Sequence, residues 1–335
     1  MERMTLGGGD FQVEIWSLGA CVNDLRMPDR GGDTASVVLG YGNEDDRRRG
    51  VAYIGEICGP YANRIAAGGY VIDGQVHTPD LNDNGTATLH GGADGWNRQD
   101  WSVVHADQQV VRLRLDWHGP ADGFPGPVHA DIEYRVEGWS LTHTVKATTD
   151  SPTVLSIVSH PYFDLSGGLG QVGDHRLQVA ASSYLPVDEA SIPLPDAPST
   201  VEGTPFDFRQ TRSVADALAS QHPQMLIHGG LDHALVLDHG GEPGCLREPS
   251  ARLSHPASGR WMDIRTDYPA LQVYSGQFLG DPALAHPSGA GRSGSGIALE
   301  TEEFPDAPRR PDFPSVVIRP GQTYSRTTTW EFGIS

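Results

Sequence analysis

The chain has 335 residues, a length that fits either two average domains or one large all-β domain. Its 24 basic and 43 acidic residues give a formal net charge of -19, which argues against nucleic acids and anionic membranes as partners because both require a basic surface. The 41 glycines and 25 prolines argue against long helices.

The first residues contain no apolar stretch of the kind found in a signal peptide, and the chain has no apolar run long enough to cross a membrane. Its three cysteines, Cys21, Cys58 and Cys245, are widely spaced and odd in number. They therefore predict neither a disulfide framework nor a paired-cysteine metal site. Reduced thiols of this kind indicate a cytoplasmic protein.

Alternating apolar and polar residues predict strands with one buried face, most clearly over 111–117 and 141–148. Between two short apolar runs, Asp73-Gly74 predicts a type I′ hairpin because glycine readily adopts the positive φ that this turn requires. Two further turns, Glu137-Gly138 and Ser258-Gly259, are interpreted in the same way.

The sequence predicts one helix, over 213–220, which begins with Ser-x-x-Asp as a weak form of a capping box. Two proline-rich stretches, 186–198 and 305–320, also contain apolar residues, so we expect ordered loops that pack on the sheets. Many short strands and little helix predict an antiparallel sandwich or barrel. We expect a single domain over 1–335.

The common nucleotide-binding, hydrolase and zinc-peptidase motifs are absent, and none of the 14 histidines form a His-x-His pair. We therefore expect neither a nucleotide cofactor nor a metal. Several polar clusters beside Gly or Pro interrupt the strand pattern instead. They are Asn63-Arg64-Ile65, Leu89-His90-Gly91-Gly92 preceded by Leu81-Asn82-Asp83-Asn84, His160-Pro161-Tyr162-Phe163-Asp164-Leu165, Leu231-Asp232-His233, Gln272-Val273-Tyr274-Ser275-Gly276, and Leu299-Glu300-Thr301-Glu302 leading into Pro305-Asp306-Ala307-Pro308.

In this order, these clusters resemble the aldose 1-epimerases, or galactose mutarotases, from about residue 50 onward. The resemblance implies a large antiparallel β-sandwich, a galactose mutarotase-like supersandwich, with a sugar cleft on one face. It also implies an isomerase that interconverts the α and β anomers of a free hexose without a cofactor. By the matching motifs, Glu300 is the general base and His160 the general acid. The same match makes Arg64, His90, Asp232 and Gln272 the groups that hold the sugar, with Asn63 beside them.

The chemistry supports this assignment, because opening a pyranose ring requires a base for the anomeric hydroxyl and an acid for the ring oxygen. A carboxylate and an imidazolium suit these tasks near neutral pH. We expect Glu300 and His160 to face one cavity across a gap the size of a sugar ring. Trp96 or Tyr162 are expected to line it, whereas His233 should point away from it and Asp306 should stabilise a loop.

Three residues depart from the family pattern and put the sugar preference in doubt: Pro60, Asp164 and Arg309. A hexose-6-phosphate epimerase would need a basic cluster, for which Arg309 and Arg310 are the candidates. A glycoside hydrolase or lyase would pair Glu300 with Asp232 as two carboxylates, and a non-catalytic sugar-binding module is a further alternative. The expected partner is a small sugar, and the chain itself is expected to be a monomer or a homodimer.

Overall fold

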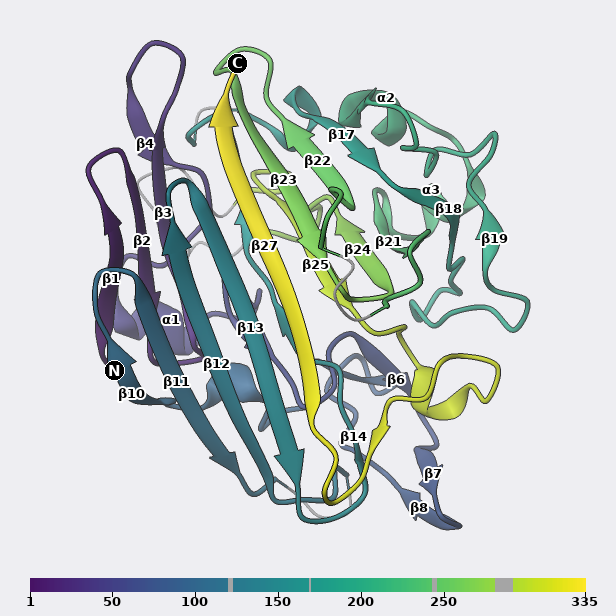
Figure 1. Cartoon of the computed structure of the whole chain (residues 1–335). Coiled ribbons are helices and arrows are strands. Elements are labelled where there is room, and N and C mark those ends of the chain that lie inside the picture. Colours follow the sequence, from purple (N-terminus) through teal and green to yellow (C-terminus); the bar gives the residue numbers. More distant parts are fainter. Residues whose placement is uncertain (120–122, 169, 243–245, 281–291) are drawn as a thin grey trace.

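The computed structural model describes residues 1–119, 123–168, 170–242, 246–280 and 292–335. Its largest element is a nine-stranded antiparallel sheet that crosses the front of the molecule (Figure 1). In sheet order, its strands are β10 (Ser102–Ala106), β11 (Val110–Trp117), β12 (Val128–Glu137), β13 (Ser140–Thr149), β27 (Tyr324–Ile334), β23 (Arg260–Thr266), β22 (Ala251–Ser254), β17 (Arg176–Val179) and β20 (Arg212–Ser213).

Two further sheets complete the layers. The six-stranded sheet consists, in order, of β16 (Tyr162–Phe163), β25 (Ile297–Glu302), β24 (Ala270–Tyr274), β21 (Asp232–Leu237), β18 (Ala181–Tyr184) and β19 (Ser199–Thr200). The four-stranded sheet consists of β1 (Arg3–Gly8), β2 (Phe11–Trp16), β3 (Cys21–Pro28) and β4 (Thr34–Ser36). Four short pairs remain: β5 (Ile57–Cys58) with β15 (Val158–Ser159), β6 (Arg64–Ala66) with β9 (Ala87–Leu89), β7 (Tyr70–Ile72) with β8 (Gln75–His77), and β14 (Thr153–Val154) with β26 (Val317–Ile318).

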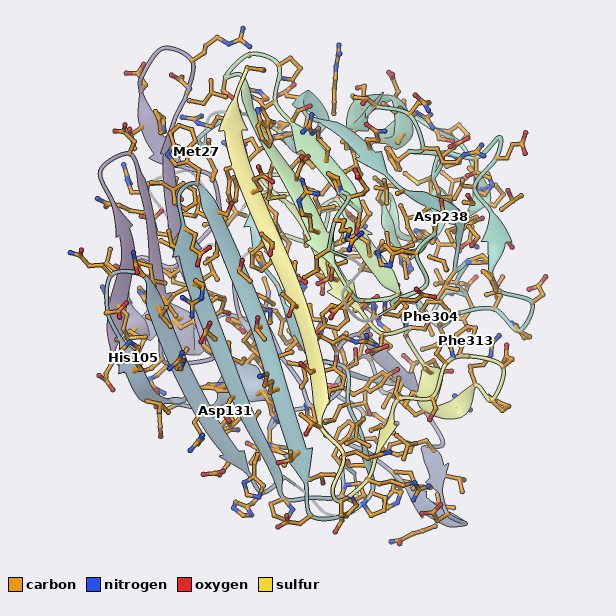
Figure 2. All side chains as sticks on the ribbon, in the orientation of Figure 1. Met27, His105, Asp131, Asp238, Phe304 and Phe313 are labelled. Atoms are coloured by element: carbon orange, nitrogen blue, oxygen red, sulfur yellow. The ribbon has the colours of Figure 1, made fainter. Side chains whose placement is uncertain are left out.

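The alternation that predicted the strands sets the two faces of the large sheet. In β11, Val111, Leu113, Leu115 and Trp117 are buried, whereas the arginines and the aspartate between them are exposed. On the exposed face Arg114 donates to Asp131 of β12 at 2.8 Å, and Figure 2 labels Asp131 on the face toward the viewer. Both predicted strands are therefore confirmed, as β11 and β13.

The turns agree with the prediction to different degrees. Asp73 and Gly74 join β7 and β8 with φ values of 51° and 81°, as a type I′ turn requires. The hairpin predicted at Glu137-Gly138 exists between β12 and β13. Its register pairs Glu137 with Ser140, so the two-residue turn is Gly138-Trp139 and not Glu137-Gly138. The predicted Ser258-Gly259 turn lies in a connection longer than two residues, because β22 ends at Ser254 and β23 begins at Arg260.

The inner faces of the two larger sheets share one core. A single cluster of buried apolar side chains runs from Met4 to Phe332. Thr301 of β25 and Thr328 of β27 approach to 2.6 Å between their hydroxyl oxygens, so these strands lie against each other. The predicted large antiparallel β-sandwich with little helix is confirmed. The single-domain organisation stays a prediction.

Among the described residues, three short α-helices lie outside the sheets: α1 (Glu44–Arg49), α2 (Val214–Leu218) and α3 (Pro223–His228). The predicted helix is α2, although its N-cap residue Ser213 makes no side-chain capping bond. Prediction missed α1 and α3, which are each only six residues long. The proline-rich stretch after residue 304 is ordered as predicted, with Phe304 and Phe313 side by side at 5.1 Å between ring centroids (Figure 2).

The sequence contains no apolar run long enough to cross a membrane and only three cysteines, and the structure bears on both observations. No helix in the described ranges combines the length and apolar character needed to span a membrane. Cys21 and Cys58 are buried free thiols, and Cys245 lies outside the described residues.

Candidate active site

A cavity of about 480 Å³ opens beside the six-stranded sheet, and all seven predicted site residues line it. They are Asn63, Arg64, His90, His160, Asp232, Gln272 and Glu300. The cavity walls also contain apolar and aromatic groups: Val51, Ala52, Tyr53, Leu89, Tyr162, Tyr274, Phe278 and Leu279. Such a mixture, in which a few polar groups converge between apolar walls, is typical of a small-molecule site.

Three adjacent strands supply one wall of the cavity. Gln272 of β24 lies directly opposite Glu300 of β25 in the register, and β21 on the other side of β24 begins with Asp232. Gln272 Nε2 donates to Asp232 Oδ1 at 2.6 Å. Side chains at paired positions of neighbouring strands are close enough to interact, so the sheet brings together residues that are far apart in sequence.

The predicted base and acid are in direct contact. His160 Nε2 lies 3.3 Å from Glu300 Oε2, and both side chains are almost fully buried. The expectation of a gap the size of a sugar ring between them is therefore wrong. The reason is sheet register: β16 pairs with β25 through Tyr162 and Ala298, which brings His160, two residues earlier, opposite Glu300, two residues later.

Burial determines the protonation of this pair. It raises the pKa of Glu300 well above its ordinary value, and the nearby charge of Asp232 raises this pKa further. Burial also lowers the pKa of His160 to about 4. Both shifts favour the neutral forms of the two groups, not the carboxylate and imidazolium expected from the sequence.

The main chain holds His160 from both sides. Its N–H donates to the Glu56 carbonyl oxygen, and its own carbonyl oxygen accepts from the Gly55 N–H, both at 2.9 Å. The Glu56 side chain is fixed in turn by Arg47, at 2.9 Å between Nη1 and Oε1, and both side chains are only 1% exposed. No motif in the sequence indicates this buried ion pair.

His90 has a defined tautomer. Its Nδ1 accepts the Asn63 N–H at 3.2 Å, and because a backbone N–H can only donate, this nitrogen carries no proton. In the neutral ring, the proton is therefore on Nε2, which acts as a donor. Burial favours that neutral ring, since it lowers the pKa of His90 well below its ordinary value, as do His160 and Arg64.

His90, His160 and Glu300 also offer three potential metal-ligand atoms within 4.8 Å of one another. A metal would need the lone pair of His90 Nε2, which the bond to Asn63 leaves protonated. The donor set therefore fits sugar hydroxyl groups better than a metal ion.

The remaining sugar-holding candidate, Arg64, forms an ion pair with Asp83. Its Nε donates to Asp83 at 2.7 Å, and both side chains are 17% exposed. Asp83 lies in the Asn-rich stretch before His90, so that stretch orients the arginine. The aromatic ring of Tyr53 lies 4.4 Å from the His90 ring, between centroids, and forms another wall of the cavity.

Four other residues with an expected position are Tyr162, Trp96, His233 and Asp306. Tyr162 lines the cavity, but Trp96 does not, because it is fully buried against Trp101 and Trp117. His233 is buried and contacts Gln224 at 3.0 Å instead of the cavity. Asp306 accepts the Ala66 N–H at 3.0 Å, which is a structural contact, as expected.

The three departures from the family pattern lie outside the cavity wall. Asp164 accepts the backbone N–H groups of Ser166 and Gly168, at 3.0 and 2.9 Å, and so fixes a turn. Neither Pro60 nor Arg309 is among the residues that line the cavity.

The large antiparallel β-sandwich and the cavity in which Glu300 and His160 meet agree with an isomerase that acts on sugars. The chain belongs to the aldose 1-epimerase family, because the family model described as aldose 1-epimerase matches residues 2–331.

Among curated relatives, the galactose mutarotase of Rattus norvegicus is 34% identical over 100% of this chain and 95% of its own length. The aldose 1-epimerase of Escherichia coli K12 is 33% identical over 96% of this chain and 91% of its own length.

Two solved structures share the fold. An aldose epimerase homologue from C. elegans superposes with a TM-score of 0.90 at 26% identity, covering 99% of each chain. The galactose 1-epimerase from Lactobacillus acidophilus has a TM-score of 0.84 at 26% identity, covering 99% of this chain and 94% of that one.

Proposed function

We propose that this protein interconverts the α and β anomers of a free hexose of the galactose and glucose class, with Glu300 as the general base and His160 as the general acid. The observation that carries the proposal is the buried contact of 3.3 Å between these two groups in a cavity lined by polar side chains. Relatives named galactose mutarotase and aldose 1-epimerase support the choice of reaction.

The direct contact between Glu300 and His160 suits the opening of a pyranose ring. The anomeric hydroxyl oxygen and the ring oxygen are both bonded to C1, so the atom that loses a proton and the atom that gains one are close together. A base and an acid side by side on one wall can therefore serve both. Each positioned group contributes typically about 10²–10⁴-fold to the rate.

The proton transfers balance over the reaction, because the pair takes one proton from the sugar and gives one back. The reaction requires a proton on His160 and none on Glu300 in the sugar complex, the reverse of the distribution that burial favours. Glu300 then takes the proton of the anomeric hydroxyl while His160 gives its proton to the ring oxygen, and the ring opens. Rotation about the C1–C2 bond followed by the reverse transfers closes the ring with the opposite configuration.

Arg64, His90, Asp232 and Gln272 hold the sugar hydroxyls, with Asn63 beside them. Charged and amide groups make directional hydrogen bonds to hydroxyls, and the aromatic walls cover the apolar faces of the ring. The sugar is neutral, because Arg64 is the one cationic side chain in the described wall besides the histidines and is already paired with Asp83.

The competing functions have less support. Arg310 donates to the backbone carbonyl groups of Pro193, Leu194 and Pro195, and Arg309 lies 3.9 Å from Asp306, so neither provides a phosphate site in the cavity. A hydrolase would require two carboxylates flanking a glycosidic bond. Here the partner of Glu300 is His160 instead.

We also propose that the protein acts in the cytoplasm, where free thiols such as Cys21 and Cys58 stay reduced. There it would act on its sugar as a monomer or a homodimer.

The test is polarimetry on freshly dissolved α-D-galactose. Wild type should accelerate the decay of optical rotation, and Glu300→Gln should lose about 10²–10⁴-fold in rate because the amide cannot accept the proton. Glu303→Gln is the matched control, since Glu303 is equally buried but pairs with Arg326 at 2.7 Å and does not line the cavity. A wild type without activity, or a fully active Glu300→Gln, would refute the assignment.

A further inference from the structure

A second buried carboxyl group lies on the same strand as the proposed base. Glu302 is two residues beyond Glu300 in β25 and has no solvent exposure. Both of its carboxyl oxygens lie 3.3 Å from Asn63 Nδ2. Residues two apart in a strand point to the same face, so Glu302 extends the row of polar groups behind the cavity wall.

Asn63, which Glu302 contacts, is the centre of a small hydrogen-bond network. Its Oδ1 accepts the Arg64 N–H at 2.9 Å, so its amide nitrogen must face Glu302. Its backbone N–H donates to His90 Nδ1 at 3.2 Å, and its carbonyl oxygen accepts the His90 N–H at 3.0 Å. Asn63 therefore connects Glu302 with two of the residues proposed to hold the sugar.

The backbone of Asn63 has an uncommon conformation. Its φ of 58° is in the left-handed region, which few residues other than glycine adopt, although asparagine and histidine do so more often than most. His90, with a φ of 53°, lies in the same region. Without an acceptor for its Nδ2, Asn63 would lose one of the contacts that fix this conformation.

We propose that Glu302 is a positioning residue of the sugar site: by accepting the Asn63 amide, it holds the His90 ring and the Arg64 backbone in the arrangement that receives the sugar. This inference rests on the proposed function, because the sugar is the ligand whose affinity it affects.

Glu302 acts as a hydrogen-bond acceptor and needs no charge for this role. Burial raises the pKa of Glu302 well above its ordinary value, and the proximity of Glu300 raises this pKa further. A neutral carboxyl and a carboxamide both present a carbonyl oxygen to the Asn63 amide. Glutamine at position 302 should therefore still accept the hydrogen bond of the Asn63 amide. Leucine, which is of similar size, cannot accept it.

The experiment is a double-mutant cycle measured by polarimetry on α-D-galactose. Glu302→Leu should raise KM about tenfold and leave kcat within about threefold, since a buried amide loses its acceptor. Glu302→Gln should stay near wild type. In an Asn63→Ala background, Glu302→Leu should have no further effect, because its action passes through Asn63. Thr301→Val is the control, as it removes a buried hydroxyl that contacts Thr328 on the opposite face of β25.

Hydrogen exchange of the Asn63 and Arg64 amides in sugar-free protein provides a readout that does not depend on activity. It should be faster in Glu302→Leu and unchanged in Glu302→Gln. If wild type lacks mutarotase activity but these exchange rates behave as expected, the proposed function fails and the positioning contact stands.

The inference is overturned if Glu302→Leu keeps the wild-type KM and exchange rates, if its effect persists in the Asn63→Ala background, or if Glu302→Gln is as defective as Glu302→Leu. If Glu302→Leu does not fold, Glu302→Met replaces it in the cycle, and the result for Glu302→Gln still decides whether an acceptor suffices.

Discussion

Replacing Arg47 with methionine should destabilise the protein by about 3–5 kcal/mol, because it leaves the buried Glu56 carboxylate without its charged partner. The ion pair is 2.9 Å long, and each side chain is 1% exposed. The Asn97 amide and the Tyr41 hydroxyl also donate to Glu56, at 3.0 and 3.2 Å, but neither carries a charge. A loss of this size is a large part of the roughly 5–15 kcal/mol that stabilises a typical protein.

The stability lost in Arg47→Met should be partly restored by a second substitution, and its size should depend on pH. In the double variant Arg47→Met/Glu56→Gln no charge is buried, so about 2 kcal/mol or more of the loss should return. Burial already raises the pKa of Glu56, and without Arg47 the folded state should bind this proton more tightly still. Since the folded state then binds more protons than the unfolded state, the deficit of Arg47→Met should shrink as pH falls toward the unfolded carboxyl pKa of about 4.3.

Urea unfolding followed by tryptophan fluorescence at pH 7 and pH 5 measures these differences. Arg112→Met is the matched control, because Arg112 and Glu133 form a pair with side chains 53% and 26% exposed, for which we expect a loss below about 1 kcal/mol. A deficit for Arg47→Met no larger than that of the control, or one that does not change with pH, would refute the reasoning.

Two other predictions concern the site. Because burial lowers the pKa of His160 to about 4, polarimetric kcat/KM should fall on the acid side only toward pH 4; a fall centred near pH 6.5 would contradict this. Gly91→Ala should cost more than about 3 kcal/mol, measured by urea unfolding, because its Cβ would lie 2.1 Å from the Gly59 carbonyl oxygen at a φ of +86°. Gly138→Ala, at a φ of +60° with open space around it, should cost only about 1–2 kcal/mol, and equal losses would show that the close contact is unimportant.

The fold was predictable where side-chain periodicity is strong. The alternation in β11 and β13 gave both strands and their buried faces, because period two is a local signal. The short helices gave weaker signals: α1 has an Asn43 cap, acidic residues in its first turn and basic ones in its last, and α3 begins with Pro223. Such signals are easy to miss because six residues show almost no helical periodicity.

For the candidate site, motif resemblance identified the seven residues that line the cavity. It gave no role to Glu56, Asp83 or Glu302, whose importance arises from contacts across the fold, although Asp83 and Glu302 lie in the polar clusters. It also gave the wrong spacing of Glu300 and His160, because that spacing follows from the pairing of β16 with β25 and no local pattern encodes it.

The position of β27 has a consequence for how the protein is made. β27 follows every other strand of the nine-stranded sheet in the chain, yet it lies in the middle, between β13 and β23 (Figure 1). Until the ribosome has released residues 324–334, β13 and β23 each present an unpaired edge, which is prone to aggregation. We therefore expect the nine-stranded sheet to close only once β27 has been synthesised.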